Sequence, residues 1–148
     1  MSSYINAALR RLVATRAEYL CEYCLIHEED AFFGCEVDHI ISEKHGGQTE
    51  ADNLAYACAF CNRSKGSDIG SIVQRTGVFV RFFNPRTDLW VEHFALDGVV
   101  IVTLSDIGEV TARILDFNNS DRLFERQTLQ VIGRYPSAAA LVRMARRT

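Results

Sequence analysis

The sequence lacks any apolar run long enough to cross a membrane. A spanning helix needs roughly 18 or more consecutive apolar residues, and none of that length occurs in the 148 residues. The first residues also lack the charged and then apolar pattern of a secretory signal. We therefore expect a cytoplasmic protein that acts outside the membrane.

Repeats, low-complexity segments and Pro- or Gly-rich linkers are also missing. With 48% hydrophobic residues, residues 1–148 are expected to form a single domain around one core. The net charge of -3 disfavours a protein that holds nucleic acid by overall positive charge. Basic residues nevertheless gather near both ends, at Arg10, Arg11, Arg16, Arg134, Arg143, Arg146 and Arg147. A bound divalent metal would add further local positive charge.

The spacing of apolar residues predicts both helices and strands, and therefore an α+β fold. Helical spacing occurs over residues 3–19, 107–115, 123–132 and 138–144, and for part of the segment that ends near Gly77. Residues 35–41, 78–83, 89–94 and 99–104 are predicted strands, because they are rich in β-branched and aromatic residues or alternate weakly. We expect an N-terminal helix and, after residue 78, antiparallel strands that form a meander with two or three helices.

Four of the five cysteines form two short pairs, Cys21-x-x-Cys24 and Cys58-x-x-Cys61, separated by 33 residues. Two such turns close a tetrahedral four-sulfur site, which is typical of structural zinc. A disulfide framework is not expected in a reducing compartment. The alternative is two unrelated pairs of buried thiols, and Cys35 is best explained as a small core residue.

Between and after the cysteine pairs lies a series of polar motifs. In order, they are Asp38-His39, Gly46-Gly47, Asn53-Leu54 and Asn62-x-x-Lys65. With these motifs, residues 21–68 resemble the HNH endonuclease family. The resemblance implies a ββα-metal fold clamped by zinc, in which the first strand of a hairpin carries Asp38 and His39 and the following helix carries the third motif residue. Residues 78–148 would then be a β/α extension.

The residue types suit phosphodiester hydrolysis. Histidine is the side chain best able to exchange a proton near neutral pH, so His39 is the candidate general base. The oxygens of Asp38 and Asn62 suit a hard divalent cation. The resemblance assigns the same roles and makes Asn53 the residue that orients the strand bearing His39. Many family members have His at the third position, and the Asn found here leaves Mg²⁺, Mn²⁺ and Ni²⁺ open.

Neighbouring residues on a regular strand point to opposite faces. Asp38 and His39 therefore cannot both face one site from regular β geometry. We expect a bend or a strand end at this position, or a ligand supplied partly from elsewhere. The simpler interpretations are that Asp38 and His39 form a surface pair and that Asn53 only shapes a turn.

The resulting prediction is a metal-dependent endonuclease with structural zinc and catalytic Mg²⁺ or Mn²⁺, acting on DNA and expected to bind the double-stranded form. Lys65 and Arg63 either contact substrate phosphates or are solvated charges. One alternative is a zinc-dependent module that binds nucleic acid without cleaving it, and another is a protein-interaction module whose C-terminal half binds the partner. The C-terminal extension either enlarges a small core or is a module for specificity or partner binding.

Overall fold

The computed structural model describes residues 4–147. It begins with helix α1 (Ala7–Arg16), which is shorter than the predicted helix over 3–19; residue 3 lies outside the described part. The helix starts where the side chain of Asn6 accepts a hydrogen bond from the Leu9 amide at 2.8 Å, an N-terminal cap. Its apolar face, centred on the buried Val13, packs against strand β2.

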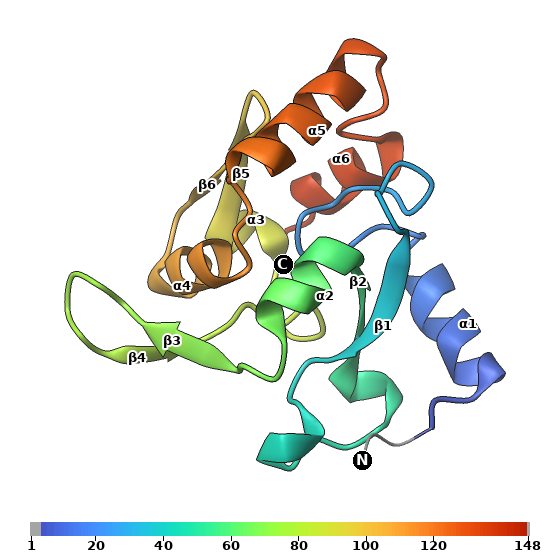
Figure 1. Cartoon of the computed structure of the whole chain (residues 1–148), viewed down its shortest axis with the longest axis vertical. Coiled ribbons are helices and arrows are strands. Elements are labelled where there is room, and N and C mark those ends of the chain that lie inside the picture. Colours follow the sequence, from blue (N-terminus) through green and yellow to red (C-terminus); the bar gives the residue numbers. More distant parts are fainter. Residues whose placement is uncertain (1–3, 148) are drawn as a thin grey trace.

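A hairpin followed directly by a helix forms the centre of the molecule. Strand β1 (Cys35–His39) pairs antiparallel with β2 (Leu54–Cys58), and α2 (Ala59–Lys65) begins immediately after β2. Two short 3₁₀ turns, η1 (Glu43–His45) and η2 (Ala51–Asn53), lie in the loop between the strands. Helix α1 lies on one side of this hairpin and α2 on the other (Figure 1). This is the ββα arrangement that the resemblance to the HNH family implied.

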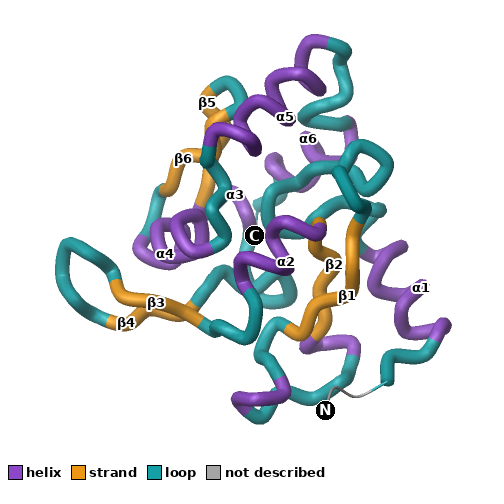
Figure 2. Tube along the Cα trace, in the orientation of Figure 1, coloured by secondary structure: helices purple, strands orange, loops and turns teal. Residues whose placement is uncertain are grey.

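The rest of the chain adds two more hairpins and four helices (Figure 2). The hairpins are β3 (Gly70–Ile72) with β4 (Phe79–Arg81) and β5 (Phe94–Asp97) with β6 (Val100–Thr103). The helices are α3 (Trp90–His93), α4 (Asp106–Ile114), α5 (Ser120–Val131) and α6 (Ala138–Ala145). The α+β class is confirmed. Within residues 4–147 the strands form three separate two-stranded sheets, so the predicted meander is wrong.

One local prediction is also wrong, and packing explains why. Residues 89–94 were predicted to be a strand, but Trp90 to His93 form α3. A helical turn brings Trp90 and Phe94 to the same side, where their ring centroids lie 5.2 Å apart in the core. The segment from the second cysteine pair to near Gly77 was expected to be helical for part of its length, and α2 confirms this; Gly70 then begins β3. A Cβ at Gly70 would lie 2.4 Å from the Val80 carbonyl oxygen, so the close pairing with β4 requires glycine.

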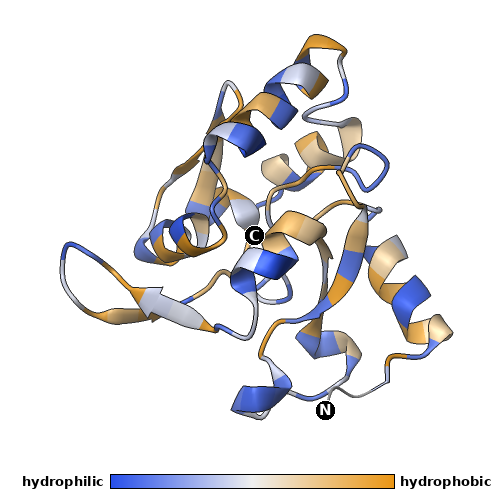
Figure 3. Ribbon diagram, in the orientation of Figure 1, coloured by the Kyte–Doolittle hydropathy of each residue, from blue (hydrophilic) through white to orange (hydrophobic). Residues whose placement is uncertain are grey.

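One apolar core runs through the cysteine segment and the C-terminal extension. Its buried members include Leu20, Ile26, Phe83, Trp90, Leu115 and Tyr135. Helices α4 and α5 show alternating apolar and polar bands in Figure 3, as expected for helices that bury one face. No helix within residues 4–147 has the length and apolar character needed to span a bilayer.

Candidate active site and four-cysteine centre

The two cysteine pairs meet in the core. The sulfur atoms of Cys21, Cys24, Cys58 and Cys61 all lie within 4.8 Å of one another, and all four residues are buried. In each pair a backbone amide points back at the first sulfur, from Cys24 to Cys21 at 3.4 Å and from Cys61 to Cys58 at 3.5 Å. A tetrahedral zinc ion with its usual bond lengths would hold sulfurs about 3.8 Å apart. The Cys24 and Cys58 sulfurs are 3.8 Å apart, so the residues fit a structural zinc ion.

Arg122 of α5 completes this centre, and no sequence motif had indicated it. Its guanidinium donates to the sulfur of Cys24 at 3.0 Å, with those of Cys58 and Cys61 at 3.6 and 3.7 Å. It also lies 5.4 Å from the centre of the Phe60 ring. Four thiolates around Zn²⁺ carry a net charge of about -2, and the buried Arg122 offsets part of it. The extension therefore contributes directly to the cysteine centre.

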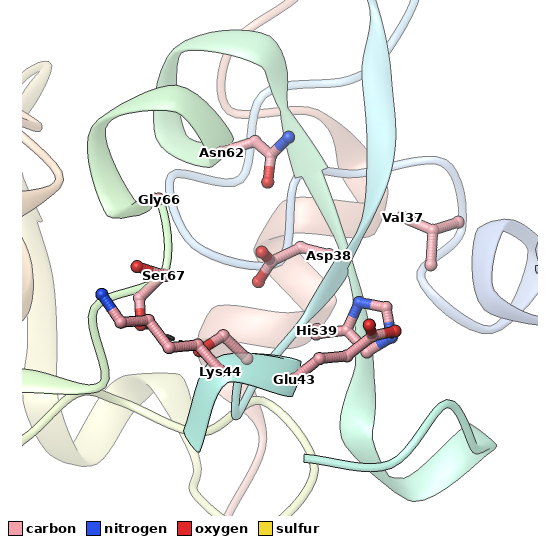
Figure 4. A pocket seen from close by; sticks show the side chains of 9 residues that line it. Val37, Asp38, His39, Glu43, Lys44, Asn62, Gly66 and Ser67 are labelled. Atoms are coloured by element: carbon pink, nitrogen blue, oxygen red, sulfur yellow. Dashed lines mark hydrogen bonds and ion pairs between the residues drawn. The ribbon is translucent and has the colours of Figure 1, made fainter. Parts of the chain in front are cut away.

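An open pocket of about 670 Å³ lies beside this centre (Figure 4). Residues of β1, of the η1 turn and of α2 line it. They include Asp38, His39, Glu43, Lys44 and Asn62, with Gly66 and Ser67 after α2. The structure thus brings together three of the four predicted catalytic side chains at one cavity. Asn53 does not line it. Strand β1 ends at His39, as expected for a site that uses two neighbouring residues.

Asp38 is a buried carboxylate held by two partners. Tyr23 donates its hydroxyl to Oδ2 at 3.2 Å, and the Lys65 ammonium lies 3.1 Å from Oδ2 and 3.3 Å from Oδ1. Lys65 also donates to the His39 carbonyl oxygen at 2.8 Å. Burial raises the pKa of Asp38, and Lys65 and Tyr23 offset only part of that rise. Lys65 therefore provides the main local countercharge.

This position of Lys65 does not suit the contact with substrate phosphates that its place in the motif suggested. Its side chain is 1% exposed, and its ammonium is engaged with Asp38 and His39. Arg63, the other predicted contact, is exposed on α2 beside Asn62. Of the two, only Arg63 remains available to a ligand in the solvent.

His39 is oriented from one side of its ring. Nε2 lies 2.8 Å from the Thr49 hydroxyl and 3.4 Å from the Glu43 carboxylate, and Thr49 in turn donates to Glu43 at 3.2 Å. Within residues 4–147, Nδ1 has no hydrogen-bond partner. The histidine thus has one nitrogen held in place and the other unoccupied, which is the arrangement a general base requires. The motif analysis did not identify Thr49 or Glu43.

Asn53 ties together the loop that follows β1. Its Oδ1 accepts from the Ile41 amide at 2.9 Å, and its Nδ2 donates to the carbonyl oxygens of Ile41 and Gln48, both at 2.9 Å. Gly47 lies against the same backbone, since a Cβ there would be 1.7 Å from the Ile41 oxygen. The Gly46-Gly47 and Asn53 motifs therefore close one loop, which also carries Thr49 and Glu43.

Asn62 has a defined amide orientation. Its Nδ2 donates to Oε2 of Glu36 at 2.5 Å, and its oxygen faces Asp38 (Figure 4). Glu36 is two residues before Asp38 and so lies on the same face of β1. That period-two spacing was the available sequence signal for Glu36.

Comparison with known proteins bears on the same segment. A family model described as HNH endonuclease matches residues 21–68, from the first cysteine to just beyond α2. Neither a curated protein nor a solved structure matches the chain. The family match indicates a nuclease or a related nucleic-acid function, built around the zinc-type cysteine centre.

Proposed function

We propose that this protein is a metal-dependent endonuclease that hydrolyses phosphodiester bonds in double-stranded DNA, because residues 21–68 match a family model described as HNH endonuclease. One observation carries the proposal: Asp38, His39 and Asn62 line a single open pocket. A buried cysteine centre and a closed loop hold the strand and helix that bear them. The three side chains are the candidate catalytic groups, and the cysteine centre and the loop hold them in fixed positions.

The oxygens of Asp38 and Asn62 are proposed to hold the catalytic ion, Mg²⁺ or Mn²⁺. The fit rests on the donor set. Because Nδ2 of Asn62 donates to Glu36, the side-chain oxygen of Asn62 is left for a ligand. The ionised carboxylate of Asp38 has about four acceptor positions, and Tyr23 and Lys65 do not occupy all of them. Hard divalent ions prefer such oxygens. When bound, the ion would supply positive charge to the phosphate and the departing oxygen.

His39 is proposed to act as the general base. Its Nδ1 takes a proton from a water molecule, whose oxygen forms the new bond to phosphorus while the bond to the 3′ oxygen breaks. Glu43 and Thr49 hold the opposite side of the ring, so the imidazole keeps its orientation as it gains positive charge. Asn53 is proposed as a positioning residue, because it fixes the loop that carries both partners.

Lys65 and Tyr23 are proposed as positioning residues for Asp38. Both bind the carboxylate from the buried side, and Lys65 links it to the backbone of His39. The same pair favours a second candidate function. Since Lys65 already pairs with Asp38, the carboxylate has a countercharge without a divalent ion, which suits a module that binds nucleic acid without cleaving it.

Plasmid cleavage separates the two functions. Zinc-loaded protein is incubated with supercoiled DNA in Mg²⁺, in Mn²⁺ and in EDTA, and nicked and linear products are followed on gels. The endonuclease predicts products with either ion, none in EDTA, and none from Asn62→Ala with either ion. Binding of the plasmid without products under any of these conditions would establish the non-catalytic function.

A further inference from the structure

The basic side chains divide into engaged and unengaged groups. The chain has 16 Lys and Arg residues, and most contact carboxylates, sulfurs or backbone carbonyl oxygens. Among residues 4–147, four have side chains without a hydrogen bond or ion pair: Arg11, Lys44, Arg63 and Arg146. Arg10 uses only its Nε, which donates to the Ile5 carbonyl oxygen at 3.0 Å. The positions of these five cations show where an anionic ligand would find uncompensated charge.

Three of the five line the catalytic pocket or a hollow that adjoins it, and a fourth follows a lining residue. Lys44 lines the pocket itself, and Arg63 follows Asn62 on α2. Arg10 and Arg11 line a second hollow of about 320 Å³ between α1 and β1. Val37 lines both hollows, so they adjoin across β1. In Figure 4 its side chain points to the α1 side, away from Asp38 and Asn62.

The second hollow suits an anion. Arg10 and Arg11 are exposed, and the opposite face of α1 is buried on β2, so the helix presents them outward in a fixed position. The single carboxylate among the described residues that line it, Glu36, is hydrogen bonded to Asn62. Arg16 on the same helix, by contrast, is occupied with the carbonyl oxygens of Ala51 and Leu54.

We propose that Arg10 and Arg11 contact the sugar–phosphate backbone of the nucleic acid next to the bond being cut. The proposal rests on the proposed function. Val37 and His39 are separated by roughly 7 Å along an extended strand, and over that distance one strand of a duplex advances by about two nucleotides along the helix axis, at 3.4 Å per nucleotide. The backbone that enters the catalytic pocket therefore passes the α1 arginines within a few nucleotides. Such contacts position the substrate without reading its sequence.

The salt dependence of DNA binding tests the proposed contacts of Arg10 and Arg11. Anisotropy of a labelled 20-base-pair duplex is measured from low to moderate salt, with His39→Ala in every protein to prevent cleavage. The test variant carries Arg10→Ala and Arg11→Ala. The control carries Arg146→Ala and Arg147→Ala, which removes the same charge at residues that line neither hollow. Zinc content and circular dichroism establish that all the proteins are folded.

Each lost phosphate contact should lower the slope of log K against log salt by about 0.9, so the test variant should lose nearly 2 in slope. Its affinity at low salt should fall about tenfold or more, with the control unchanged. Equal slopes and affinities in test and control would overturn the proposal while leaving a cleaving enzyme intact. A wild-type protein that neither binds nor cleaves the duplex would overturn the proposed function as well.

Discussion

Replacing Lys65 by methionine should strongly destabilise the protein. Lys65 is 1% exposed and Asp38 is 6% exposed, so neither group is well solvated. Loss of one partner from a buried ion pair leaves the other charge uncompensated and costs about 3–5 kcal/mol. A domain of this size is stable by about 5–15 kcal/mol. Lys65→Met should therefore remove a large share of the free energy of unfolding.

Urea denaturation of zinc-loaded protein, followed by circular dichroism, measures this loss. A double-mutant cycle isolates the pair: Asp38→Asn alone leaves Lys65 uncompensated, whereas the double variant removes both charges and should cost clearly less than the sum of the single changes. If the two losses add within about 0.5 kcal/mol, or if Lys65→Met alone costs no more than that, the pair does not hold the site together.

Two further predictions concern the cysteine centre and pH. Arg122→Met should weaken zinc retention about 10- to 100-fold in competition with a chromogenic chelator, because it removes a side chain that contacts the zinc ligands. Arg126→Met is the control, since Arg126 is buried on the same helix but does not reach the sulfurs. This control should retain zinc as the wild type does. Burial raises the pKa of Asp88, but hydrogen bonds from Arg81 and the Asn84 amide lower it overall below its ordinary value. Asp88 should therefore stabilise the protein above about pH 4 and lose this effect as pH falls further. The difference in melting temperature between the wild type and Asp88→Asn should shrink in acid. A difference that grows in acid would contradict the lowered pKa of Asp88.

The features that depend on short spacing could be predicted from the sequence. The two cysteine pairs predicted the zinc site, because each pair is a short local turn, and the resemblance carried by the motifs between and after them implied the ββα unit. Helices α4, α5 and α6 were equally visible from their apolar spacing. Residues 89–94 were not, since a short aromatic run suits a strand or a helix, and burial of Trp90 against Phe94 decides between them.

The partners of the site residues depend on the tertiary fold. Arg122 reaches the sulfurs from 61 residues beyond Cys61, and no local pattern marks such a contact. Lys65 follows a zinc turn in a position where most lysines would be solvated, and only the packing of α2 against β1 buries it. Tyr23 lies between two cysteines, where it would ordinarily be taken for part of the zinc turn.

The rate of cleavage by His39→Ala tests the central claim most directly. Single-turnover cleavage of a labelled duplex is measured in Mg²⁺ and in Mn²⁺, with His45→Ala as a control for changes in the same loop and with equal zinc content in all the proteins. The account predicts a rate about two to four orders of magnitude below wild type for His39→Ala and a nearly unchanged rate for His45→Ala. Cleavage by His39→Ala at the wild-type rate would contradict it.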